Sequence, residues 1–218
     1  MKKLVYILAY CLISACQGPK RPSESAPITA VDSVNKKISK PDTSESPITP
    51  SSVPAIRKAY AATMERWNTK DFDSIAISYT CKQERSGTIT YYSARGKISL
   101  IKHAYSEYDH HSATDHYFVA NDTLYFVYSN KVSWSFESGS AGQAATKDDI
   151  TESRTYLLEG KSALCLEKKY SIHSQRPDPT LAERTPNRTV NCKPTLPLVN
   201  TYKKLVAFQK RANGECFD

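Results

Sequence analysis

The chain lacks the sequence motifs of several common enzyme classes. It contains no Gly-x-Ser-x-Gly of a hydrolase nucleophile, no His-Glu-x-x-His of a zinc protease and no Cys-x-x-Cys pair. Its seven glycines form no phosphate-binding loop. We therefore expect no cofactor, and we favour a protein that is not an enzyme.

Long hydrophobic runs are also lacking. The apolar run Leu4–Ile13 is too short to remain in a bilayer as a spanning helix. It follows a positive start, Met1-Lys2-Lys3, in the layout of a secretory signal. The next residues, Ile13-Ser14-Ala15-Cys16, resemble the lipobox of bacterial lipoproteins. This resemblance implies that residues 1–15 are a signal peptide and that lipid on Cys16 anchors the chain in a bilayer. The alternative is an ordinary signal peptide with a chance cysteine near its end.

Aromatic residues are absent between Tyr10 and Tyr60, where proline, serine, threonine and lysine are frequent. Such a segment buries too little apolar surface to offset the entropy of ordering, so we expect residues 16–53 to be a disordered tether. Residues 54–218 then form a single globular domain. The whole chain has a net charge of +8, of which about +5 falls in this domain. This modest excess forms no basic stripe, and we expect no nucleic-acid partner.

Four cysteines remain beyond the signal peptide and the lipidated residue: Cys81, Cys165, Cys192 and Cys216. An even number in an exported chain predicts two disulfides, with three possible connectivities. We favour Cys192 with Cys216, which would tie back the C-terminal tail, and Cys81 with Cys165, which would link two strands.

Hydrophobic periodicity predicts an α+β fold. Ile56, Tyr60, Met64 and Trp67 lie at helical spacing after Pro54, and residues 198–212 again have a helical period. Between these helices, three aromatic strands each run into a two-residue turn: Arg95-Gly96, Asn121-Asp122 and Glu159-Gly160. We expect an antiparallel meander of about six or seven strands with the first helix on one face. The C-terminal helix should also pack on the sheet, closing an end or edge of it.

Two connections are expected to be irregular. Residues 131–149 predict a surface loop around a serine- and glycine-rich centre, and residues 174–197, with five prolines and no aromatic, predict a long loop near Cys192.

The hairpin sequences resemble those of small, uncharacterised lipoproteins of Bacteroidota. The matching stretches are Gly87-Thr88-Ile89-Thr90-Tyr91-Tyr92, His116-Tyr117-Phe118 with Leu124-Tyr125-Phe126-Val127, and Thr155-Tyr156-Leu157-Leu158-Glu159-Gly160-Lys161. The resemblance covers about eighty residues, and it implies the same order of lipobox, tether, helix and hairpins. It implies no activity and no catalytic residues. The cysteines and the region after Ser174 depart from the pattern.

Candidate site residues are few. Tyr108-Asp109-His110-His111-Ser112-Ala113-Thr114-Asp115-His116 is the only dense cluster of histidines and carboxylates. Such side chains can bind a transition metal, so His110, His111 and His116 are the candidates for a metal-dependent enzyme. The simpler interpretation is a solvated connection between strands. For binding, the candidates are the sheet tyrosines Tyr91, Tyr92, Tyr125 and Tyr128. Adjacent strand residues point to opposite faces, so Tyr91 and Tyr92 cannot both face inward on one sheet.

These observations favour a lipoprotein of the cell envelope that binds an envelope protein or glycan without catalysis. The alternatives are the metal-dependent enzyme and a purely structural spacer. We expect the outer membrane, and the basic sequence Gln17-Gly18-Pro19-Lys20-Arg21 favours its periplasmic side over the cell surface.

Overall fold

A computed structural model describes residues 48–82, 84–137, 145–211 and 214–217. The expected signal peptide, Cys16 and most of the expected tether lie outside these residues. The last part of the expected tether already contacts the domain, because the Thr49 hydroxyl donates a hydrogen bond to the Ala120 carbonyl at 3.3 Å. Within the described residues, no helix has both the length and the apolar character needed to cross a membrane.

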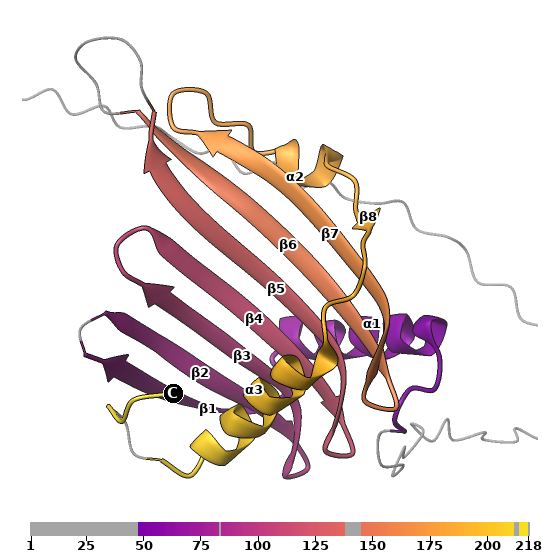
Figure 1. Cartoon of the computed structure of the whole chain (residues 1–218). Helices are drawn as coiled ribbons and strands as arrows, with labels where there is room; N and C mark the ends of the chain where they lie inside the picture. The colour runs from indigo at the N-terminus through magenta and orange to yellow at the C-terminus, as the bar shows by residue number, and fades with distance from the viewer. Residues whose placement is uncertain (1–47, 83, 138–144, 212–213, 218) are drawn as a thin grey trace, which may run out of the picture. The chain divides into compact units, whose positions relative to one another are not determined.

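The domain is built on one antiparallel sheet of eight strands whose spatial order follows the chain (Figure 1). Short connections make such a meander the simplest way to pair successive strands. The strands are β1 (Asp73–Cys81), β2 (Arg85–Ala94), β3 (Lys97–Glu107), β4 (His111–Ala120), β5 (Thr123–Phe136), β6 (Thr146–Leu158), β7 (Lys161–His173) and β8 (Arg188–Thr189).

All three predicted hairpins are present: β2–β3, β4–β5 and β6–β7. The two turn residues of each have positive φ, 53° and 74° at Arg95-Gly96, 47° and 58° at Asn121-Asp122, and 51° and 74° at Glu159-Gly160. Two consecutive residues with positive φ form the turn that matches the twist of antiparallel strands. Each hairpin also has a register shift close to its turn, and such bulges increase the local twist of a sheet.

The first helix, α1 (Val53–Asn68), covers one face of the sheet. The Ser52 hydroxyl accepts a hydrogen bond from the Ala55 amide at 3.3 Å, and Pro54 occupies the first turn, where a missing N–H costs nothing. Ile56 is fully buried and packs on Leu100, Phe118 and other residues of this face. The predicted opening helix is thus confirmed.

The C-terminal helix, α3 (Thr195–Phe208), covers the opposite face (Figure 1). It begins three residues before the predicted start and ends four residues before the predicted end. Its buried residues Tyr202, Leu205 and Phe208 pack on the side chains of β1 to β5 that point away from α1. The predicted packing of a C-terminal helix on the sheet is thus confirmed, but the helix covers a face and does not close an end or edge. The sheet carries two apolar faces, and each of them requires a covering helix.

The two expected loops are shorter than predicted. Strand β5 continues to Phe136 and β6 starts at Thr146, and the serine- and glycine-rich centre, residues 138–142, lies outside the described residues. The second expected loop, residues 174–197, contains a helical turn, α2 (Leu181–Arg184), and strand β8. Strand β8 raises the number of strands to eight. Lys168 Nζ donates to the Ala182 carbonyl at 2.7 Å, and Arg154 donates to the Asn187 side chain at 2.6 Å.

Both disulfides exist, but the favoured pairing was wrong. Cys81 bonds to Cys216 with a Cα–Cα distance of 4.9 Å, and Cys165 bonds to Cys192 at 5.3 Å. Five strands separate β1 from β7, which places Cys81 and Cys165 roughly 29 Å apart at about 4.8 Å per strand. A disulfide spans at most about 7 Å between Cα atoms. The fold therefore excludes the pairing of Cys81 with Cys165.

Candidate functional site

The histidines of the 108–116 segment do not come together. His110 lies at the turn before β4, with its ring 4.0 Å from that of Trp134. His111 contacts the Ser133 hydroxyl at 3.0 Å. His116 points to the α1 face, between the rings of Trp67 and Tyr128. Across the described residues, no three His, Cys, Asp or Glu side chains are grouped to hold a metal ion.

The segment is not only a solvated connection, because β4 begins at His111 and two thirds of the segment belongs to the strand. Burial lowers the pKa of His116 to about 4, and the nearby charge of Lys102 acts in the same direction. His116 is therefore a neutral side chain packed under α1.

The candidate tyrosines do not share an exposed face. Tyr91 and Tyr125 are 1% and 2% exposed, so neither can contact a partner. Tyr91 faces α3 and donates a hydrogen bond to the Leu205 carbonyl at 2.7 Å, whereas Tyr92 faces α1 and packs against Trp67. Tyr91 and Tyr92 point to opposite faces and are both partly or fully covered, because the sheet has a helix on each side. Tyr128, half-buried on the α1 face, lies under the guanidinium of Arg154.

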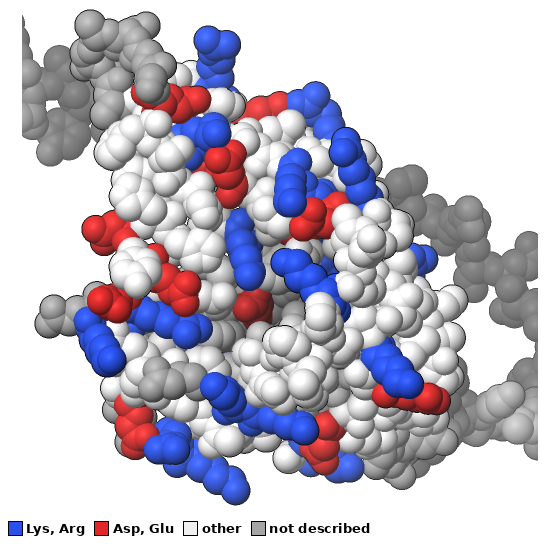
Figure 2. All heavy atoms as spheres, in the orientation of Figure 1, with Lys and Arg blue, Asp and Glu red and all other residues white. Residues whose placement is uncertain are grey.

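A pocket opens instead on the α3 face, beside the first turn of that helix. It has a volume of about 570 Å³, within the range of about 300–1,000 Å³ usual for small-molecule sites. Figure 2 shows a hollow on this face, with acidic atoms recessed in it and Lys and Arg side chains around it. The hollow lies where α3 no longer covers the longer strands β5 to β7 (Figure 1).

The floor of the pocket is a row of polar residues that crosses five strands. The strand register places His103, Asp115, Ser129, Ser153 and Glu167 directly opposite one another in β3, β4, β5, β6 and β7. Two residues along each strand, toward α3, the neighbouring row is largely apolar. It contains Ile101, Tyr117, Val127, Thr155 and Cys165. The α3 face of the sheet therefore changes from apolar to polar at the border of the area that α3 covers.

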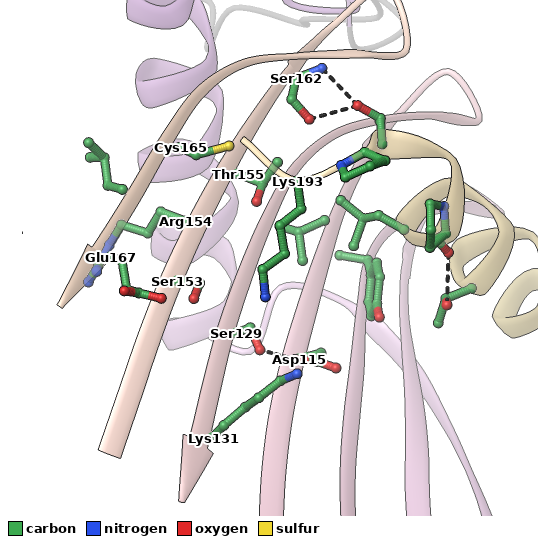
Figure 3. A pocket seen from close by; sticks show the side chains of 18 of the residues that line it. Asp115, Ser129, Lys131, Ser153, Arg154, Thr155, Ser162, Cys165, Glu167 and Lys193 are labelled. Atoms are coloured by element: carbon green, nitrogen blue, oxygen red, sulfur yellow. Dashed lines mark hydrogen bonds between the residues drawn. The ribbon is translucent and has the colours of Figure 1, made fainter. Parts of the chain in front are cut away.

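The chain from Val190 to α3 covers one side of the pocket. The Cys165–Cys192 disulfide joins this segment to β7, and Val190 N donates a hydrogen bond to the Cys165 carbonyl at 3.0 Å. The Ser162 amide donates to the Thr195 hydroxyl at 3.1 Å, which holds the start of α3 at the same rim. The disulfide and the two hydrogen bonds therefore position Lys193 over the floor (Figure 3).

Aromatic and histidine side chains form the wall on the β3 side. His103 is 1% exposed, shares a hydrogen bond with the Tyr79 hydroxyl at 2.8 Å and stacks on Tyr105 at 4.6 Å. Burial, aided by the charge of Arg85, lowers the pKa of His103 to about 3, so its imidazole is neutral. Phe217, next to the Cys81–Cys216 disulfide, packs behind His103 at 5.1 Å. The rings of this wall are neutral, and the guanidinium of Arg85 lies 4.9 Å from the centre of the Tyr105 ring.

Asp115 is the buried charge of the floor. Its side chain accepts a hydrogen bond from Ser129, and the residue is only 9% exposed. Burial raises the pKa of Asp115, while the Ser129 hydrogen bond and the charges of Lys131 and Arg85 act in the opposite direction. A buried carboxyl with a raised pKa costs stability at neutral pH, and such groups occur preferentially at functional sites.

Comparison of the chain with protein-family models, curated proteins and solved structures found no match. The interpretation of the pocket therefore depends on its geometry. Asp115 belongs to the histidine-rich segment that the sequence singles out, whereas Ser129, Lys131, Ser153 and Lys193 of the pocket were not predicted. The only signal for Ser129, Lys131 and Ser153 was the mainly polar sequence in the second half of β5 and the first two thirds of β6, next to the apolar ends of the same strands. Lys193, next to a cysteine in a proline-rich stretch, had no signal.

Proposed function

We propose that this chain is a lipid-anchored protein of the cell envelope that binds an envelope molecule without catalysis. The pocket beside α3, with the buried carboxyl of Asp115 in a row of polar side chains, is the observation that carries this proposal. The binding site is thus this pocket and not the sheet tyrosines. The bound molecule is a small envelope ligand, or a protein or glycan that inserts a small group.

Rigid walls support binding over a structural spacer. Two disulfides lie next to opposite sides of the pocket, and the floor belongs to five paired strands. A preorganised site loses little conformational entropy when a ligand enters, which favours affinity. A spacer would not need a buried carboxyl that opposes folding. No contact among the described residues favours a metal-dependent reaction at His110, His111 and His116.

The anchoring part of the proposal is the lipid on Cys16, in the outer membrane and on its periplasmic side. Metabolic labelling with radioactive palmitate should mark the wild-type chain. Cys16→Ser should abolish the label and release the chain from the membrane fraction. A labelled Cys16→Ser chain would disprove anchoring through this residue.

The binding part can be tested by placing a bulky side chain on the floor. Ser153 points into the pocket from β6, so Ser153→Phe should occlude it (Figure 3). Ser135→Phe is the matched control, because Ser135 is exposed on β5 outside the pocket. The full lipidated chain, in nanodiscs of phosphatidylcholine, is incubated with a fractionated envelope extract, and retained molecules are identified by mass spectrometry. We expect molecules that are retained by wild type and Ser135→Phe and lost with Ser153→Phe. If occlusion changes nothing that is retained, the pocket is not the binding site.

A further inference from the structure

The pocket is polarised along the direction of its strands. Tyr117 and Val127 lie at its inner end beneath α3, and Asp115 and Ser129 lie two residues further along β4 and β5. Lys131 follows after two more residues of β5, on the same face. Successive rows are about 7 Å apart, so the backbones of Val127 and Lys131 are separated by roughly 13 Å. A ligand that fills the pocket therefore meets apolar side chains at one end and a positive charge at the other.

A second lysine faces the first across the floor. Figure 3 shows Lys193 extending from the segment before α3 and Lys131 extending from β5, each toward the Ser129–Asp115 pair from a different side. Within the part of the chain that the structure describes, neither ammonium group lies within 4.0 Å of a carboxylate. Both lysines are therefore available to a ligand.

Two other charged residues of the pocket have partners within the protein. Arg85 pairs with Glu107 at 3.2 Å, and Glu167 pairs with Lys169 at 2.9 Å. Asp115 is the one carboxylate of the floor that no ion pair joins among the described residues, and its hydrogen bond comes from a neutral hydroxyl. Two lysines and one carboxylate leave the pocket with a net positive charge. The start of α3, where no side chain caps the first amides, adds the positive end of a helix dipole at the rim.

We infer that the pocket binds a small organic anion, with an apolar body under α3 and a carboxylate or phosphate group between Lys131 and Lys193. This inference rests on the proposed function and specifies its ligand. Asp115 then faces the middle of the ligand, where a carboxylate accepts a hydrogen bond from a hydroxyl or N–H group. The same anionic chemistry is found in free organic acids and in the head groups of acidic lipids.

Three probes with one apolar body test the sign of the recognised charge. Binding of 4-phenylbutyrate, 4-phenylbutanol and 4-phenylbutylamine to the full chain in phosphatidylcholine nanodiscs is measured by calorimetry, with empty nanodiscs as blanks. We expect the acid to bind more tightly than the alcohol and the amine to bind least. Lys131→Gln with Lys193→Gln should weaken the acid about tenfold, as expected for two partly exposed charge contacts, and should leave the alcohol unchanged. Lys203→Gln with Lys204→Gln, on the exposed side of α3, is the matched control.

Short-chain lipids distinguish the two sources of the anion. Dihexanoyl phosphatidylglycerol is soluble in water, and competition between it and 4-phenylbutyrate can be measured in the same assay. Displacement of the acid by this lipid assigns the site to acidic lipids, and binding of the acid without displacement assigns it to free organic acids. Either result supports the inference.

Two results would overturn the inference that the pocket binds an organic anion. One is an amine that binds as tightly as the acid, and the other is a lysine variant that binds the acid with unchanged affinity. The proposed function would survive both if Ser153→Phe still abolished retention of an envelope molecule. If Ser153→Phe has no effect on any probe or extract, both proposals fail together.

Discussion

Removing each disulfide separately should destabilise the domain by different amounts, because the two bonds close loops of different length. Cys165–Cys192 spans 27 residues and Cys81–Cys216 spans 135. In the chain-entropy account, these loops correspond to about 3.5 and 5 kcal/mol of stability at 25 °C. Loss of the second bond also frees Phe217, a 4% exposed side chain whose burial contributes up to about 2 kcal/mol more. We therefore expect Cys81→Ser with Cys216→Ser to be the more damaging pair.

Urea unfolding can measure both effects under oxidising conditions. The fluorescence of Trp67, which packs from α1 onto Tyr92 and His116, and of Trp134 on β5 reports the transition. Both double variants should lower the free energy of unfolding. The loss for Cys81 with Cys216 should be the larger by about 1.5–3.5 kcal/mol, with or without the contribution of Phe217. Equal losses, or a larger loss for Cys165 with Cys192, would refute the reasoning from loop length and tail packing.

Three further substitutions test the core and the floor of the pocket. Asp115→Asn should be more stable than wild type at neutral pH but not below pH 3.8. The reason is that the pKa of Asp115 is raised in the folded chain, so the unfolded chain loses this proton first as the pH rises, and ionisation favours unfolding. Urea midpoints between pH 3 and 7 should show this, at about 1.4 kcal/mol per unit of pKa difference. Gly87→Ala should lower the free energy of unfolding by about 1–3 kcal/mol, measured by thermal unfolding. A Cβ at this position would lie 2.8 Å from the Tyr79 hydroxyl and 2.7 Å from a backbone oxygen. Tyr91→Phe should cost about 1–3 kcal/mol in urea, since it leaves the buried Leu205 carbonyl without its hydrogen bond.

Each of these substitutions has a control or a contrary outcome. Asp73→Asn, at an exposed position of β1, is the matched control for Asp115→Asn. Tyr60→Phe should be nearly neutral, because Tyr60 is 37% exposed on α1. An Asp115→Asn variant that loses stability at neutral pH would show that the carboxylate supports the fold. A Gly87→Ala variant with unchanged melting temperature would show that the two strands can separate locally.

Local features of the fold could be read from the sequence because they depend on neighbouring residues. A proline after a serine begins α1, and two-residue turns of Arg-Gly, Asn-Asp and Glu-Gly end the strands. Alternating aromatic residues continue the strands between these turns. Since each hairpin pairs with the next, this information was enough for an antiparallel meander with a helix at each end. The number of disulfides followed from the even number of cysteines.

Tertiary structure alone decided which side chains meet. The strand register aligned Asp115 with Ser129 and Ser153, and the position of α3 covered half of one face and left the polar half open. The same helices buried Tyr91 and Tyr125, whose strand patterns resemble those of exposed tyrosines. The distance between β1 and β7 excluded the pairing of Cys81 with Cys165, and the positions of Cys192 and Cys216 next to β7 and β1 decided the partners. These properties depend on contacts between residues far apart in the sequence, and the pattern around any one residue contains no information about its distant neighbours.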